Sequence, residues 1–178
     1  MSGTIQNNTI GTLNSANSGS LLGNGISIQN EGAITIKMLI SGNTIQQVAS
    51  FPGISTNVGL GGIATGGGTT NVTITNNTVR NIGSRGIVVQ DNQTTAPLFP
   101  TICADISGNT FSGIAGQAGN GEFMRVRRLN GTVNVRQAAP TAAANAAELD
   151  DANGFNDPTK INVSGTVNFN GAACTQPN

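Results

Sequence analysis

Four short phrases of the chain share one pattern, in which a Gly or Asn precedes an Asn, a Thr and an apolar residue. They are "IQNNTI" at 5–10, "ISGNTI" at 40–45, "ITNNTV" at 74–79 and "ISGNTF" at 106–111. Aligned on the Asn before the Thr, the phrases stand 35, 34 and 32 residues apart. A repeat of about 20–50 residues is the signature of a solenoid, in which each unit buries its apolar face against its neighbours. The repeat therefore predicts a stack of similar units.

Each unit is predicted to consist of short strands. Before the phrases, apolar and polar residues alternate, which indicates a strand with one buried face. The clearest runs are Ile34, Ile36, Met38 and Ile40, then Val72 and Ile74, then Ala104 and Ile106. A second strand that starts with Gly is expected at 25–29, 62–66 and 86–90. No apolar residues in the repeat unit have helical spacing. Three short strands a turn describe one coil of a parallel β-helix, and the surplus residues are expected to leave the coil as two loops, 49–62 and 91–101, each with a Phe–Pro pair.

The phrase itself is interpreted as a corner between two strands. Its third residue is Gly or Asn, the types that tolerate a positive φ. The Asn that follows is expected to point inward and bond its equivalent in the next coil, as in the Asn ladders of repetitive β structures. The predicted ladder residues are Asn8, Asn43, Asn77 and Asn109. Because "LNGTV" (129–133) and "VSGTV" (163–167) lack the Asn, the ladder is expected to stop after Asn109.

The coil pattern resembles the right-handed parallel β-helix repeat of the pectate-lyase-like superfamily, in which "GI-x-I" precedes "V-T-I-x-N-N-T-I". The matching segments are "GISI…ITIKMLISGNTI", "GIATGGGTTNVTITNNTV" and "GIVV…ICADISGNTF", over roughly residues 2–136. The resemblance implies an all-β, right-handed parallel β-helix of about four to six coils over 1–136. A C-terminal cap is expected over 137–178, which is similar to the C-terminal end of large exported bacterial β-helix proteins. The fold hosts lyases, hydrolases, adhesins and inert stalks, so it does not by itself give an activity.

The cap is expected to cover the last coil, because an open coil leaves exposed sheet edges. The Ala-rich segment 140–158 is predicted to form a short helix or a folded-over loop. The two cysteines, Cys103 and Cys174, are expected to form a disulfide that ties the tail to an upstream strand. The alternative is two free thiols.

The residue types limit the chemistry. The chain has no His, Trp or Tyr, which excludes imidazole bases and leaves only six Phe for stacking on sugars. The acidic residues are scattered in the repeats, so no catalytic residue is predicted; Asp105 beside Asp91 or Glu122 is the only pairing considered. A weak Ca²⁺ candidate is the cluster of Asp150, Asp151 and Asp157, and no cofactor is expected.

One basic cluster, Arg125, Arg127, Arg128 and Arg136, allows two interpretations. The first is that these arginines dock the acidic segment 148–160 of the cap onto the last coil. The second is that Arg125, Arg127 and Arg136 bind an anionic glycan.

The composition narrows the class of partner. Eight basic and eight acidic residues give a net charge of zero, which argues against nucleic-acid binding. No apolar stretch reaches about 18 residues, so no membrane helix is expected. The start, "MSGTIQNNTI", is not a signal peptide, so the export signal of a longer secreted or cell-surface protein is expected to lie upstream.

These features favour a non-catalytic structural or adhesive module of a bacterial β-helix protein. Its partners would be cell-surface glycans, neighbouring coils of the parent chain, or a second copy through end-to-end self-association. The alternative is a fragment of a polysaccharide-active lyase or hydrolase.

Overall fold

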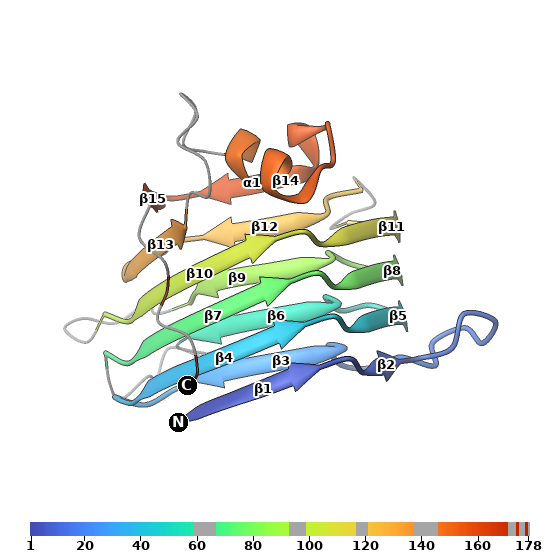
Figure 1. Cartoon of the computed structure of the whole chain (residues 1–178), viewed down its shortest axis with the longest axis horizontal. Coiled ribbons are helices and arrows are strands. Elements are labelled where there is room, and N and C mark those ends of the chain that lie inside the picture. The colour runs from blue at the N-terminus through green and yellow to red at the C-terminus, as the bar shows by residue number, and fades with distance from the viewer. Residues whose placement is uncertain are drawn as a thin grey trace.

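The computed structural model describes residues 1–58, 67–92, 99–116, 121–136 and 146–170, together with residues 174 and 177. It is a nearly all-β parallel solenoid of about four turns, which confirms the predicted fold class. Three parallel sheets form its walls (Figure 1). Sheet A contains β1 (Ser2–Gln6), β4 (Thr35–Ser41), β7 (Thr69–Thr75), β10 (Thr101–Ser107), β13 (Thr132–Arg136) and β15 (Asn168–Asn170). Sheet B contains β2 (Thr9–Ile10), β5 (Thr44–Val48), β8 (Thr78–Ile82) and β11 (Thr110–Ile114). Sheet C contains β3 (Ile26–Asn30), β6 (Ile54–Val58), β9 (Ile87–Asp91), β12 (Met124–Arg127) and β14 (Ile161–Ser164).

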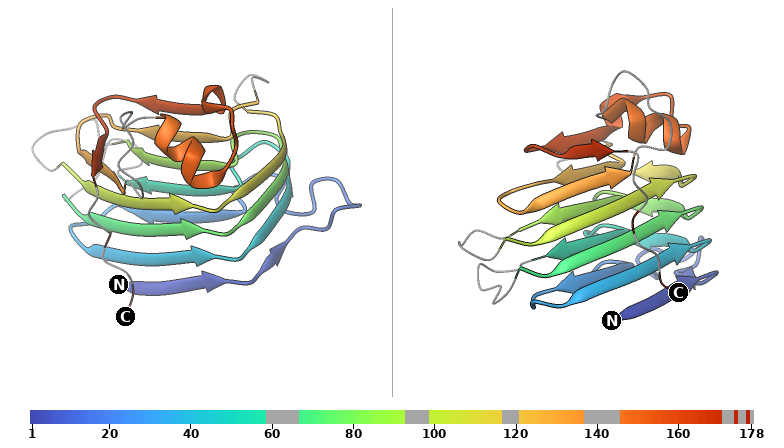
Figure 2. Two further views of the ribbon diagram at one scale, coloured as in Figure 1. Left: turned by 45° about the horizontal axis from the view of Figure 1, so that its top comes forward. Right: turned by 60° about the vertical axis from the view of Figure 1, so that its left-hand side comes forward.

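The chain visits the sheets in the fixed order A, B, C through four turns. In the next turn, helix α1 (Ala146–Asn153) stands between β13 and β14, in the sequence position that a sheet B strand holds elsewhere. The 3₁₀ helix η3 (Pro158–Lys160) leads from it into β14. Figures 1 and 2 show α1 lying over one end of the stack, with β1 and β3 at the opposite end. Residues 146–153 of the Ala-rich segment therefore form a short helix, one of the two structures expected from the sequence, and residues 140–145 lie outside the described part.

The core consists of columns of identical or similar aliphatic residues, because the strands pair in register from coil to coil. Ile40 pairs with Ile74, and Ile74 pairs with Ile106. All three are buried, as the alternation predicted. Each such side chain contributes about 1.5–3 kcal/mol on burial, so the columns supply the main driving force for stacking. Ile34 differs from the prediction, because it precedes β4 and is exposed.

The third strand of the second turn lies elsewhere than expected. The segment 62–66, predicted as a strand, lies outside the described residues. The strand is β6, inside the segment 49–62 that was predicted to be a loop, so that prediction is wrong for Ile54–Val58. The physical reason is register: Ile54 pairs with both Ile26 and Ile87, each of which follows a Gly. Of the loop 91–101, residues 93–98 lie outside the described part.

Candidate functional site

The predicted Asn ladder is present and links the coils at the corner between sheets A and B. In each rung, the backbone N–H and the Nδ2 of one Asn donate to the Oδ1 of the Asn in the next coil, at 2.9–3.0 Å. The Nδ2 groups of Asn43, Asn77 and Asn109 also donate to backbone carbonyls, such as that of Ile5 from Asn43. These three side chains are buried, so the ladder satisfies polar groups that would otherwise cost about 1–3 kcal/mol each.

The corner also has the backbone shape that its sequence predicted. The residues before the ladder Asn have φ between 55° and 65°; they are Asn7, Gly42, Asn76 and Gly108. A Cβ added at Gly42 or Gly108 would overlap the Oδ1 of the Asn in the preceding coil. Asn and Gly therefore alternate along this column because each Asn side chain occupies the space beside the next Gly.

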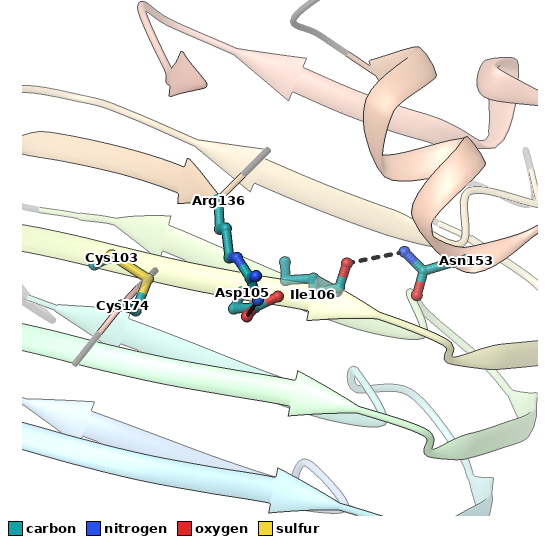
Figure 3. Close-up of polar contacts among 6 residues, drawn as sticks. All are labelled: Cys103, Asp105, Ile106, Arg136, Asn153 and Cys174. Atoms are coloured by element: carbon teal, nitrogen blue, oxygen red, sulfur yellow. Dashed lines mark hydrogen bonds and ion pairs between the residues drawn. A yellow bond between two sulfur atoms is a disulfide. The ribbon is translucent and has the colours of Figure 1, made fainter. Parts of the chain in front are cut away.

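The ladder does not stop at Asn109, which corrects the expectation from the sequence. Asn153, the last residue of α1, accepts hydrogen bonds from the N–H and Nδ2 of Asn109 at 2.9 and 3.0 Å. Its own Nδ2 donates to the carbonyl of Ile106 (Figure 3). It also donates to the carbonyl of Leu149. The carbonyl of Ala152 accepts the N–H of Gly108, as strand carbonyls do in the earlier coils. The helix thus supplies the hydrogen-bonding groups of a corner without being a strand.

The disulfide and one ion pair lie on the outer side of sheet A. Cys103 on β10 is joined to Cys174, with the two Cα atoms 5.5 Å apart. Two residues along the same strand, Asp105 accepts a hydrogen bond from Arg136 of β13 at 2.7 Å (Figure 3). The structure therefore contains the cysteine pair anticipated from the sequence, and both links join segments far apart in the chain.

The three buried carboxylates that the structure describes in the coils all have structural partners. Asp91 accepts from the N–H groups of the turn at 129–131. Asp105 pairs with Arg136, and Glu122 pairs with Arg85. The sequence raised a possible pairing of Asp105 with Asp91 or Glu122. In the structure each of these three carboxylates has a different partner.

The weak Ca²⁺ candidate forms a turn. The N–H of Asp157 donates to the buried Asp150 at 3.0 Å, and Asp157 accepts from the N–H of Thr159 at 3.1 Å. The hydroxyl of Thr159 also donates to Asp157, which holds the pKa of that carboxyl below its ordinary value. Within the described ranges, no three metal-ligating side chains gather.

The predicted arginine cluster is divided between two walls of the solenoid. Arg125 and Arg127 both point outward from β12 of sheet C, since they alternate with buried Met124 and Val126. Arg136 belongs to β13 of sheet A and pairs with Asp105 there. Arg125, Arg127 and Arg136 therefore do not form one surface.

A pocket of about 390 Å³ lies on the outer face of sheet C. Its lining includes the outward-facing Ser55 and Val88, which are paired across β6 and β9. The segment 50–52 and the pair Ser84–Arg85 contribute at the corner with sheet B, and Gln29, Gln90 and Asn24 contribute amides. Arg125 lines it from β12. We call this the sheet C pocket.

Sequence reasoning identified Arg125 but not the pocket, because the lining comes from four coils and the spacing of any one coil does not show it. Arg85 gave no signal, since it is an isolated residue in "SRG". Comparison of the chain with protein-family models, with curated proteins and with solved structures finds no match. No helix among the described residues is long and apolar enough to cross a membrane.

Proposed function

We propose that this chain is a non-catalytic structural and adhesive module of a secreted or cell-surface β-helix protein. The observation that carries the proposal is the use of the buried coil carboxylates: Asp91, Asp105 and Glu122 each hold together segments at least 31 residues apart. Lyases and glycosidases need carboxylates or bases free to act on a substrate. Here these carboxylates stabilise the stack.

The closed ladder supports the structural part of the proposal. Asn153 satisfies the last buried rung, while β1, β2 and β3 at the other end each pair with only one strand. A solenoid needs a terminal cap to stay soluble. We propose that the open end stacks on neighbouring coils of a parent chain or on a second copy. The disulfide favours an oxidising compartment.

We also propose that the solenoid is a right-handed coil of the pectate-lyase-like superfamily. Two observations support this: the A, B, C order of strands and the Asn corner between sheets A and B. The right hand is expected because crossovers between parallel strands are almost always right-handed. The polar pocket on the outer face supports the proposed adhesion to cell-surface glycans.

A turnover assay tests the proposal against its alternative, a polysaccharide-active enzyme fragment. The chain is incubated with a panel of neutral and uronate polysaccharides, and new reducing ends and unsaturated uronates are measured. We expect no product above buffer, together with retention of at least one polymer on immobilised protein. Product formation that an Asp105→Ala variant abolishes would overturn the proposal in favour of the enzyme. The unfolding transition of that variant serves as the control for folding.

A further inference from the structure

The sheet C pocket carries an excess of positive charge. Arg85 and Arg125 both line the pocket, and Arg127 lies two residues from Arg125 on β12. The described lining contains Arg85, Arg125 and no carboxylate, and Glu122, which lies outside the lining, pairs with Arg85. Burial, followed by the charges of Arg85 and Arg127, lowers the pKa of Arg125. A bound anion would relieve the same repulsion.

One donor in this pocket is left without a partner. The Nε of Arg125 is buried and has no hydrogen-bond partner among the described residues. A guanidinium is a planar fork that matches a carboxylate or sulfate, and buried donors are normally paired. Arg85 differs, because its Nε donates to Glu122. Arg125 is therefore the arginine of the pocket that forms no ion pair with a carboxylate of the described residues.

The rest of the lining suits a hydroxyl-rich molecule. Gln29, Gln90 and Asn24 offer amide donors and acceptors, and Ser50 and Ser84 offer hydroxyls. Phe51, at the rim, is 41% exposed and supplies an apolar surface for the C–H face of a sugar ring. From β3 to β12 the lining crosses three strand spacings, about 14 Å in all, which exceeds one sugar ring.

We infer that the sheet C pocket binds an acidic oligosaccharide, with the carboxylate on Arg125 and neighbouring hydroxyls on the glutamine, asparagine and serine side chains. This rests on the proposed adhesive function and names its ligand class and its site. Arg85 also lines the pocket, where its guanidinium is paired with Glu122. The ligand is held and released without a covalent step.

Calorimetric titration with two matched trimers tests the inference. The probes are a β-1,4-linked glucuronate trimer and cellotriose, which differ by a carboxylate in place of each hydroxymethyl group. The matched variants are Arg125→Gln and Arg127→Gln, since both residues point outward from β12 and lose the same charge, but only Arg125 lines the pocket. Inorganic sulfate is titrated separately.

We expect the acidic trimer to bind at least ten-fold more tightly than cellotriose. Arg125→Gln should weaken it at least ten-fold, and Arg127→Gln less than three-fold. Phe51→Ala should also weaken it, because the ring is lost while all charges stay.

Three results would overturn the inference: equal affinity for the two trimers, equal loss in the two arginine variants, or sulfate binding as tightly as the acidic trimer. Binding of neutral glycans alone would refute the acidic ligand and leave the adhesive function standing. Cleavage of the trimer would instead refute the non-catalytic function.

Discussion

At the scale of single residues, Asn153 shows how a helix can continue a ladder made by strands. Its Oδ1 accepts both donors of Asn109, and its Nδ2 reaches back to Ile106. The side chain therefore serves as a rung although its backbone is helical. The corner requires a side-chain amide at one position. Either a strand corner or a helix end can place it there.

Replacement of Asn153 by Ala should destabilise the protein by about 2–4 kcal/mol, because two buried donors of Asn109 lose their acceptor. Urea unfolding followed by circular dichroism measures the loss. Asp151→Ala is the matched control, since Asp151 is exposed on the same helix and should change the free energy of unfolding by less than about 0.5 kcal/mol. Equal losses of unfolding free energy in the two variants would show that Asn153 does not act as a rung of the ladder.

Gly108→Ala should destabilise the corner by about 2 kcal/mol or more, since φ at 108 is 64° and the new Cβ would overlap the Oδ1 of Asn76. The overlap predicts coupling between the two positions. In an Asn76→Gly background, the same Gly108→Ala change should cost less, as urea unfolding of the double-mutant cycle would show. An identical cost in both backgrounds would mean that φ alone determines the loss.

At the scale of elements, the strands that were predicted correctly are those whose signal is local. Val72, Ile74 and the corner that follows them are neighbours in sequence, so alternation and turn residues suffice. Strand β6 was missed because its Gly–Ile start lies beside a Phe–Pro pair and because its partners, β3 and β9, lie in other coils.

The parts of the site that sequence could not give are those assembled between coils. Asn153 follows no corner phrase, so nothing in "DDANG" distinguishes a rung from a helix end. The wall that Arg125 faces and the partner of Arg136 depend on which sheet each strand joins, and β13 begins five residues after the end of β12. Spacing alone therefore grouped two arginines that the fold separates.

The disulfide is an element-scale constraint with a measurable contribution. It closes a loop of 71 residues between β10 and the tail, which corresponds to about 4 kcal/mol on the chain-entropy estimate. Reduction with a phosphine should lower the free energy of unfolding by about that amount while the strand signal persists at zero denaturant. A mass increase of two hydrogens confirms that the disulfide is reduced. If the unfolding curve of the reduced protein is then unchanged, the disulfide does not stabilise the stack.

At the scale of the whole molecule, the two ends of the solenoid differ. Five exposed large apolar residues lie before residue 36: Met1, Leu13, Leu21, Leu22 and Ile34. Residues 1–30 contain no charged side chain, although proteins usually protect exposed sheet edges with charges. The described part of the other end is covered by α1 and its asparagine rung.

We therefore expect the chain to self-associate through the open end, with a sedimentation coefficient that rises with concentration. A double variant, Thr4→Lys and Gln6→Lys, adds like charges to edge strand β1, where both positions are exposed. It should shift self-association to an at least ten-fold higher protein concentration. Asn162→Lys, on β14 beside the cap, is the control and should have little effect. A larger effect of the control would place the contact at the capped end.

The ladder ties each buried corner to both of its neighbours. In each rung the N–H and Nδ2 of one Asn donate to the Oδ1 of the coil that comes later in the chain. The same Nδ2 donates backward to a carbonyl of the coil that comes before. A buried rung is therefore completed only when both adjacent coils are in place, and α1 protects the last one by supplying its acceptor. Native-state hydrogen exchange should show faster exchange of the Asn109 amide in the Asn153→Ala variant, while the rate of the Asn8 amide stays unchanged.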